Sequence, residues 1–196
     1  MYSDITGVIL AGGANKRFGG ITKATVMVGG KTIIKRMTDV LDKLFEDIII
    51  VTNTPEEFSE YKKYKIVNDI ITKAGPLGGI DAAIENTFNR AVFIFAGDMP
   101  FLNTKVIELL INNYKKGEFD AVVPRIGTFI EPLHAIYNVS AGESLKAFLT
   151  TAENHSAQNF LKKLNVNYIE MENTAELKSA FTNINTPDDL SYFENI

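Results

Sequence analysis

The chain has 196 residues, of which 45% are hydrophobic and 22% are charged, a composition typical of a soluble protein with one sizeable core. Its formal net charge of -4 argues against an extended nucleic-acid surface, which needs a clear excess of Lys and Arg. The absence of cysteine excludes disulfides, thiolate metal sites and a Cys nucleophile, and two histidines are too few for a His-rich metal centre.

We expect one domain over residues 1–196, because no Pro-rich or Ser-rich linker, internal repeat or low-complexity tract interrupts the sequence. The first residues show no signal-peptide pattern, and no apolar run reaches the roughly 18 residues that span a bilayer. The sequence therefore predicts a cytoplasmic protein that binds neither membranes nor nucleic acid.

The first strand is predicted at residues 5–11, and a glycine-rich, cationic loop follows it. This loop contains Gly12, Gly13, Arg17 and Lys23, and it is longer than strand-to-helix loops in α/β units usually are. It matches neither the phosphate loop G-x-x-x-x-G-K-[ST] nor the dinucleotide fingerprint G-x-G-x-x-G. We interpret it as a loop that wraps a triphosphate, with Arg17 and Lys23 contacting phosphate. The alternative is a flexible turn with solvated cations.

An amphipathic helix is predicted next, at residues 31–45, and a second strand at 47–53. The apolar stripe of this helix consists of Ile33, Ile34, Met37, Val40, Leu41 and Leu44. Asn53 ends the second strand, where its amide can contact a ligand or form a turn with the Thr54-Pro55 pair.

A glycine cluster in the segment G-P-L-G-G, residues 75–79, follows Asp69 and opens a helix predicted at 76–88. Glycines such as Gly78 allow a base or ribose to approach a helix N-terminus closely. The alternative is an ordinary helix start with proline at its first position.

The next strand, predicted at residues 90–98, ends at Asp98, where ligands bind in parallel α/β sheets. A carboxylate at this place suits Mg²⁺, which takes one or two protein oxygens and completes its shell with phosphates and water. Asp98 could instead cap the helix predicted at 104–117, although Thr104 is better placed for that.

The second half of the chain is less regular. The remaining expected elements are strands at 119–124, 131–139 and 166–172, helices at 141–152 and 156–164, and a last helix capped by Thr186 with Pro187 at its first position. His134 lies alone in a strand, a position more typical of a structural residue than of a catalyst. The alternation of strands and helices predicts a three-layer, Rossmann-like α/β fold with a mostly parallel sheet.

Five segments resemble motifs of nucleotidyltransferases, in particular those of the molybdenum cofactor guanylyltransferase family. Residues 10–24, L-A-G-G-A-N-K-R-F-G-G-I-T-K-A, resemble the L-A-G-G-x-x-x-R-[FM]-G-…-K signature of that family. The resemblance continues in the family's order through residues 75–80, 96–102, 131–137 and 183–190. It implies the nucleotidyltransferase type of α/β fold over nearly the whole chain.

The resemblance also implies roles for individual residues. Leu10, Ala11, Gly12 and Gly13 would face the guanine nucleotide, Arg17 and Lys23 would neutralise its phosphates, Asp69 would contact it, and Asp98 would hold Mg²⁺. Asn53 and Gly78 complete our candidate nucleotide contacts. The glycine pair of L-A-G-G favours guanine, because related cytidylyltransferases usually have L-A-A-G there.

The acceptor side of the cleft is assigned from the terminal motif, in which Asn183 and Asn185 match the family pattern. Glu131 departs from that pattern, because the family often has a polar amide or a histidine before the following proline. An acidic residue would here lie beside an anionic pterin substrate.

The reaction implied by the resemblance joins GMP from GTP to the terminal phosphate of molybdopterin and releases pyrophosphate. GTP and the molybdopterin cofactor would be the partners, and the sequence leaves open whether other proteins deliver the cofactor. Because a phosphate nucleophile is already anionic, no general base is needed. Catalysis would then depend on Mg²⁺, Lys23 and Arg17 offsetting the charge that builds on the phosphates.

Two alternatives remain at this point. A nucleotidyltransferase of the same class could act on a sugar phosphate, a polyol phosphate or another phosphorylated acceptor. A non-catalytic nucleotide-binding subunit could also retain the fold. The joint presence of Arg17, Lys23 and Asp98 argues against a pure binder, which has less need of a metal carboxylate.

Overall fold

The computed structural model describes residues 1–12, 22–69, 71, 74–152, 154–186 and 189, and it has a mixed α/β fold. The strands are β1 (Ile5–Leu10), β2 (Met27–Val28), β3 (Lys31–Thr32), β4 (Ile48–Val51), β5 (Lys65–Val67), β6 (Ala91–Ala96), β7 (Ala121–Ile126), β8 (Phe129–Ile130), β9 (His134–Asn138) and β10 (Val166–Glu170). The helices are α1 (Ile33–Leu41), α2 (Pro76–Asn86), α3 (Thr104–Tyr114), α4 (Ala141–Thr151), α5 (Ala157–Leu161) and α6 (Ala175–Ala180), with 3-10 turns η2 (Lys23–Thr25) and η3 (Pro55–Phe58).

The central sheet runs in the order β10-β7-β9-β6-β1-β4-β5, and β8 pairs with β7 at its side. β1 is parallel to both β4 and β6, β4 is parallel to β5, and β7 is parallel to β10. β9 lies antiparallel between β6 and β7. The mostly parallel sheet predicted from the sequence is therefore confirmed, with one inserted antiparallel strand.

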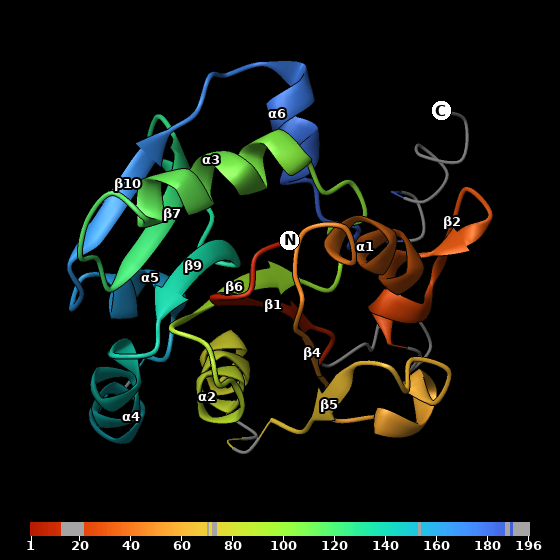
Figure 1. The fold of residues 1–196 in the computed structure, drawn as a ribbon, viewed down its shortest axis with the longest axis horizontal. Helices are drawn as coiled ribbons and strands as arrows, with labels where there is room; N and C mark the ends of the chain where they lie inside the picture. The colour runs from red at the N-terminus through yellow and green to blue at the C-terminus, as the bar shows by residue number, and fades with distance from the viewer. Residues whose placement is uncertain (13–21, 70, 72–73, 153, 187–188, 190–196) are drawn as a thin grey trace.

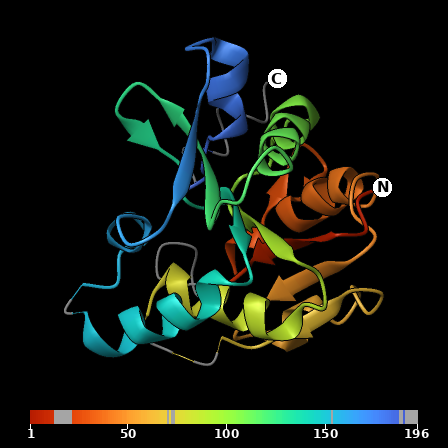
Figure 2. The same cartoon turned by 60° about the vertical axis from the view of Figure 1, so that its left-hand side comes forward.

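Helices cover both faces of this sheet and give the fold its three layers (Figure 1). The apolar side chains of α1, α3 and α6 pack on one face, and those of α2, α4 and α5 pack on the other. Figure 2 shows α2 and α4, in yellow-green and cyan, together on the same side. The apolar run of β1 is continuous because its neighbouring side chains point to opposite faces of the sheet. Ile9 packs in the core with α1 and α3, and Val8 packs in the core with α2 and α4.

Some elements differ from the sequence prediction. The short strands β2, β3, β5 and β8 and the helix α6 were not predicted, and the helix expected at 156–164 is limited to α5. β5 has a mixed burial pattern, so it lacks the apolar run that made the central strands recognisable. None of the helices in the described part of the chain is long and apolar enough to cross a membrane.

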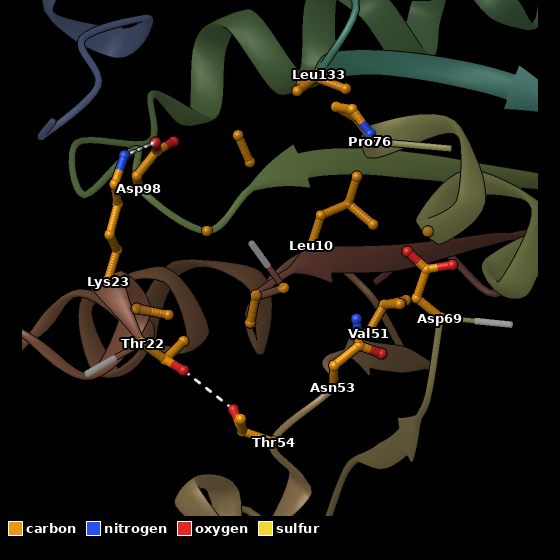
Figure 3. Close-up of a pocket in the computed structure, with 17 residues that line it drawn as sticks. Leu10, Thr22, Lys23, Val51, Asn53, Thr54, Asp69, Pro76, Asp98 and Leu133 are labelled. Atoms are coloured by element: carbon orange, nitrogen blue, oxygen red, sulfur yellow. Dashed lines mark hydrogen bonds and ion pairs between the residues drawn. The ribbon is translucent and has the colours of Figure 1, made fainter. Parts of the chain in front are cut away.

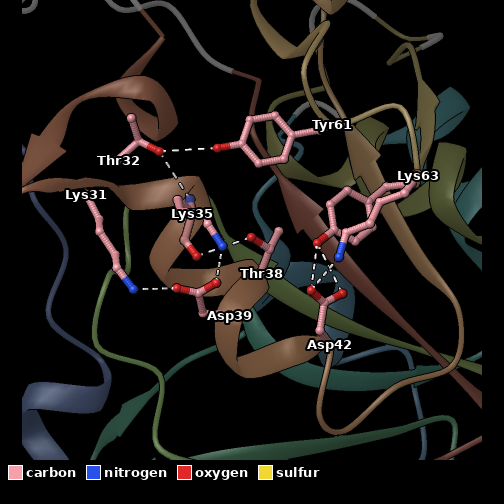
Figure 4. Close-up of polar contacts among 9 residues, drawn as sticks. Lys31, Thr32, Lys35, Thr38, Asp39, Asp42, Tyr61 and Lys63 are labelled. Atoms are coloured by element: carbon pink, nitrogen blue, oxygen red, sulfur yellow. Dashed lines mark hydrogen bonds and ion pairs between the residues drawn. The ribbon is translucent and has the colours of Figure 1, made fainter.

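The start of α1 is fixed by polar contacts on its exposed side (Figure 4). Thr32 accepts a hydrogen bond from the Lys35 backbone N–H at 3.3 Å, so the helix begins at Ile33 instead of at the predicted residue 31. Asp39 pairs with Lys31 at 2.7 Å and also with Lys35. The hydrogen bonds from these two lysines lower the pKa of Asp39 to about 2.

His134 belongs to the core, as its lone place in a strand suggested. Its side chain is fully buried, and the ring is approached edge-on by Phe93, Phe95 and Phe181. Burial lowers its pKa to about 3, and neither ring nitrogen has a hydrogen-bond partner among the described residues. The imidazole is therefore neutral and cannot reach a ligand.

The tightest backbone approach at the carboxyl end of the sheet involves Gly97, directly after β6. Its N–H donates to the Leu10 carbonyl at 2.9 Å, and a Cβ at this position would lie 2.7 Å from that oxygen and 3.0 Å from the Ala11 Cα. Since both neighbours are backbone atoms, they cannot move aside as a flexible side chain would.

We expect Gly97→Ala to lower the free energy of unfolding by about 1 to 3 kcal/mol, the usual cost of overpacking, as measured by urea denaturation. Gly12→Ala is the matched control, because among the described residues its added methyl would meet only the Asn53 Nδ2 atom, at 4.0 Å. Equal stability of the two variants would contradict the prediction.

Candidate active site

A cavity of about 630 Å³ opens where β1, β4 and β6 end (Figure 3). The last residues of these three strands, Leu10, Val51 and Ala96, all contribute to its wall. The remaining lining residues are Ala11, Gly12, Thr22, Lys23, Ala24, Asn53, Thr54, Asp69, Gly75, Pro76, Gly79, Gly97, Asp98 and Leu133. The cavity thus occupies the place that the strand order predicts for a ligand.

Lys23 and Asp98 form an ion pair at one end of this cavity (Figure 3). The Lys23 Nζ lies 3.1 Å from Asp98 Oδ2 and 2.8 Å from the Asn185 Oδ1, to which it also donates. The side chains of Lys23 and Asp98 are 24% and 21% exposed, so both groups can reach a ligand without leaving the wall. The ammonium is held by two oxygen atoms from distant parts of the chain.

The terminal motif is fixed beside this ion pair by backbone contacts. The Ile184 N–H donates to the Asp98 carbonyl at 2.9 Å. Asp189 accepts from the N–H groups of Asn185 and Thr186, both at 2.8 Å, and its own N–H donates to Thr186 Oγ1 at 3.3 Å. These two backbone hydrogen bonds lower the pKa of Asp189. This reciprocal contact between Thr186 and Asp189 is the pattern of a capping box, and it orients Asn185. The helix predicted to follow Thr186 lies outside the described residues.

Asp69 lies at the other end of the cavity, against the first turn of α2 (Figure 3). Its Oδ1 accepts from the Ile71 N–H at 2.9 Å. Burial raises its pKa, and the Ile71 hydrogen bond partly opposes that effect. A Cβ on Gly78 would clash with Asp69 Oδ1, so glycine at this position allows the carboxyl group to lie where it does.

The structure brings most of the predicted site residues together. The cavity wall contains seven of them, namely Leu10, Ala11, Gly12, Lys23, Asn53, Asp69 and Asp98. Asn185 joins them through Lys23, whereas Gly78 lies behind Asp69 and does not line the cavity. The predicted contacts Gly13 and Arg17 lie outside the described residues. Asn183 keeps its Oδ1 buried, with no hydrogen-bond partner among the described residues.

Several residues of the wall were not singled out from the sequence, among them Thr22, Thr54 and Leu133. Threonine and leucine are common residues, and neither carries a chemical signature in isolation. Thr22 directly precedes Lys23, and Leu133 lies inside the E-P-L-H-A-I-Y segment. Proximity to a recognised motif was therefore the one signal that could have identified two of them.

Glu131 is a buried carboxyl group close to the Asp98 end of the site. It is 8% exposed, and its Oε1 accepts from the Leu133 N–H at 3.1 Å. Its pKa is raised to about 6, mainly because the group is buried. The Leu133 hydrogen bond opposes this increase, and the negative charge of Asp98 adds to it. The acidic residue noted in the sequence is thus protonated more readily than an exposed glutamate.

The donor set of the site suits a magnesium ion better than a metal that needs a protein cage. No group of three or more His, Cys, Asp or Glu side chains that could hold a metal occurs among the described residues. Lys23 donates to Oδ2 of Asp98, whereas no hydrogen bond from a described residue reaches Oδ1. A single carboxylate oxygen fits Mg²⁺ whose other ligands are phosphates and water.

Comparison with known proteins agrees with this geometry. Residues 7–168 match the family described as MobA-like NTP transferase domain. A probable molybdenum cofactor guanylyltransferase of Natranaerobius thermophilus is 35% identical, over 97% of this chain and 95% of its own length. The molybdenum cofactor guanylyltransferase of Desulfosudis oleivorans is 33% identical, over 97% and 94% of the two chains.

Solved structures show the same fold. The crystal structure of molybdopterin-guanine dinucleotide biosynthesis protein A from Archaeoglobus fulgidus superposes with a TM-score of 0.83, at 28% identity and 97% coverage of both chains. A 2-C-methyl-D-erythritol 4-phosphate cytidylyltransferase of Thermus thermophilus shares the fold, with a TM-score of 0.70, 14% identity and 96% coverage of both chains. From its sequence, its fold and the site that its strands build, the chain belongs to the MobA-like NTP transferase family.

Proposed function

We propose that this protein is a magnesium-dependent molybdenum cofactor guanylyltransferase, which transfers GMP from GTP to the phosphate of molybdopterin and releases pyrophosphate. The observation that carries the proposal is the contact of Lys23 with Asp98 and Asn185 in the wall of the cavity. The names of its relatives support the choice of substrates. We expect the reaction to occur in the cytoplasm.

The proposed reaction is a substitution at the α-phosphorus of GTP. An oxygen of the acceptor phosphate forms a bond to that phosphorus, and the bond from the α-phosphorus to the oxygen bridging the α- and β-phosphates breaks. The electron pair leaves with pyrophosphate. The nucleophile is already anionic, so the neutral, buried His134 is not needed as a base.

The described residues would contribute by holding charge in a fixed place. The Lys23 ammonium offsets negative charge that develops on the phosphates, and Asn185 limits the directions in which it can point. Asp98 is the residue that would hold Mg²⁺. When bound, the ion would neutralise phosphate oxygens as a Lewis acid. For Arg17, which lies outside the described residues, we propose the phosphate-binding role on the sequence motif alone.

The nucleoside part of GTP would occupy the other end of the cavity. Asp69 offers a carboxyl group for ribose or base, and Asn53 lies in the same wall. Gly12 leaves room for a ligand to approach the backbone, since the one atom of the described chain within 4 Å of a Cβ there would be Asn53 Nδ2, at 4.0 Å. We propose Leu10, Ala11, Gly12 and Gly13 as the guanine-nucleotide segment.

The acceptor would bind near the terminal motif. Asn183 and Asn185 are our proposed acceptor contacts, and an amide side chain can both donate hydrogen bonds to a pterin and accept them from it. Glu131 lies near Asp98 and influences the charge that an anionic acceptor meets. Whether other proteins deliver the cofactor is a separate question.

Asp98→Asn keeps the size of the side chain and removes its charge. We expect pyrophosphate release from GTP and molybdopterin to fall by about 10²- to 10³-fold, as for loss of one preorganised electrostatic contact, and the Mg²⁺ concentration for half-maximal rate to rise. Thermal unfolding should show a folded variant, because surface ion pairs contribute little stability. Full activity with unchanged Mg²⁺ dependence would refute the metal assignment.

A screen of the four ribonucleoside triphosphates tests the substrate class. We expect pyrophosphate release with molybdopterin to be greatest for GTP and to require the acceptor. A related transferase would show its highest rate with another triphosphate or with a sugar phosphate. A protein whose melting temperature rises with GTP, but which releases no pyrophosphate with any acceptor, would be a nucleotide binder.

Glu131 makes the stability of the protein depend on pH in a defined direction. Its pKa is higher in the folded protein than the ordinary value of 4.5, so the folded state binds the proton more tightly. Stability from this group is therefore greatest at low pH and is lost as the pH rises through about 6. Relative to Glu131→Gln, the wild type should lose about 2 kcal/mol of unfolding free energy between about pH 4 and 8 in metal-free buffer.

The measurement is urea denaturation across that pH range, and the exposed Glu108 of α3 supplies the control variant Glu108→Gln. That control should keep the pH dependence of the wild type. A Glu131→Gln curve parallel to the wild-type curve would show that Glu131 ionises in the folded protein as it does in water.

A further inference from the structure

Glu57 makes a two-point contact with Thr22 just outside the ion pair of the active site. The Thr22 backbone N–H donates to Glu57 Oε2 at 3.1 Å, and the Thr22 hydroxyl donates to Glu57 Oε1 at 3.0 Å. Both carboxylate oxygens are therefore engaged by one residue. Hydrogen bonds of this kind, to an ionised acceptor, are stronger than neutral ones.

Threonines extend this contact to the end of β4. The Thr22 hydroxyl lies 3.0 Å from the Thr54 hydroxyl, a contact drawn as a dashed line in Figure 3. The Thr54 N–H also donates to the Thr52 hydroxyl at 3.1 Å. Since the Thr22 proton points to Glu57, Thr54 is the donor to Thr22 in this arrangement. Thr22 is 4% exposed and Thr52 is fully buried, so the contact is held inside the structure.

This arrangement determines the position from which the Lys23 side chain begins. Lys23 follows Thr22 directly and opens the turn η2, in which the Thr22 carbonyl accepts from both the N–H and the hydroxyl of Thr25. The N–H, carbonyl and hydroxyl of Thr22 all have partners as a result. A lysine has a long, flexible side chain, so the direction of its ammonium depends on a fixed backbone.

We infer that Glu57 is a positioning residue for Lys23, which acts through Thr22 to hold the ammonium where the phosphates of the nucleotide bind; this inference rests on the proposed function. Glu57 does not line the cavity and has no need to touch the substrate. The adjacent Phe58 is fully buried, so the turn that carries Glu57 is anchored in the core.

A purely structural role for Glu57 makes a different prediction. If the contact only stabilises the fold, its loss would lower activity by the same factor whether or not Lys23 is present. If it positions Lys23, its loss has little effect once the lysine side chain is removed. A double-mutant cycle between Glu57 and Lys23 separates the two roles.

The experiment compares Glu57→Gln in the wild type and in Lys23→Ala. Glutamine keeps the size of the side chain, but it removes the charge and one of the two acceptor oxygens. We expect kcat for pyrophosphate release to fall about tenfold in the wild-type background, with a smaller change in KM for GTP, and less than about twofold in Lys23→Ala. Equal losses of kcat in the two backgrounds, or no loss in the wild type, would overturn the inference.

Variants of neighbouring residues serve as controls. Glu56 is exposed in the same turn, so Glu56→Gln should retain wild-type kcat. Thr22→Val removes the hydroxyl that donates to Glu57, so its loss of kcat should resemble that of Glu57→Gln and should be smaller in Lys23→Ala. Equal losses of kcat from Thr22→Val in the two backgrounds would count against the inference.

GTP binding distinguishes failure of this inference from failure of the proposed function. If the wild type releases no pyrophosphate with GTP and molybdopterin, the proposed reaction is wrong. The same cycle is then measured as GTP affinity by calorimetry. Weaker binding from Glu57→Gln only when Lys23 is present would support the positioning role, and equal effects in both backgrounds would overturn it.

Discussion

The site depends on one close approach between two stretches of backbone, at the ends of β1 and β6. The Gly97 N–H meets the Leu10 carbonyl, and no side chain fits between them. Because of this approach, Asp98 leaves the sheet beside the residues that follow β1. The Ala11 N–H also donates to the Val51 carbonyl, which adds β4 to the same edge. Three strand ends thereby form one wall without any contribution from a ligand.

The charged groups around this wall lie in two kinds of environment. The ion pair of Lys23 and Asp98 is partly exposed, so it adds little to stability but leaves both groups accessible. Asp69 is partly buried and Glu131 is buried, and burial raises the pKa of both. The site therefore combines a charged end, where phosphate chemistry would occur, with carboxyl groups whose protonation depends on their surroundings.

Much of the fold could be predicted because its signals are local. β1 and β6 have continuous apolar runs because both of their faces are buried. α1 has an apolar stripe because only one of its faces is buried. β9 was expected as a strand, but its antiparallel insertion between β6 and β7 was not, because register and neighbours depend on contacts between distant residues. Short elements such as β5 lack an apolar pattern long enough to detect.

The same difference between local signals and long-range contacts applies to the residues of the site. Asp98 and Lys23 were identified because their charge, strand-end position and motif point to phosphate and metal chemistry. The partners of Lys23 could not be derived from spacing, since Asn185 is 162 residues away. Thr22 and Glu57 lie 35 residues apart, and Glu57 belongs to none of the recognised segments, so the hydrogen bond between them could not be derived from the sequence.

The contact between Lys23 and Asn185 also links the charged end of the site to the completion of the core. Ile184, which directly precedes this asparagine, is fully buried, and its N–H donates to the Asp98 carbonyl. One short stretch of chain therefore fills the core with one residue and holds the Lys23 ammonium with the next. Cleavage of the chain before this stretch would loosen the packing and release the lysine in a single event.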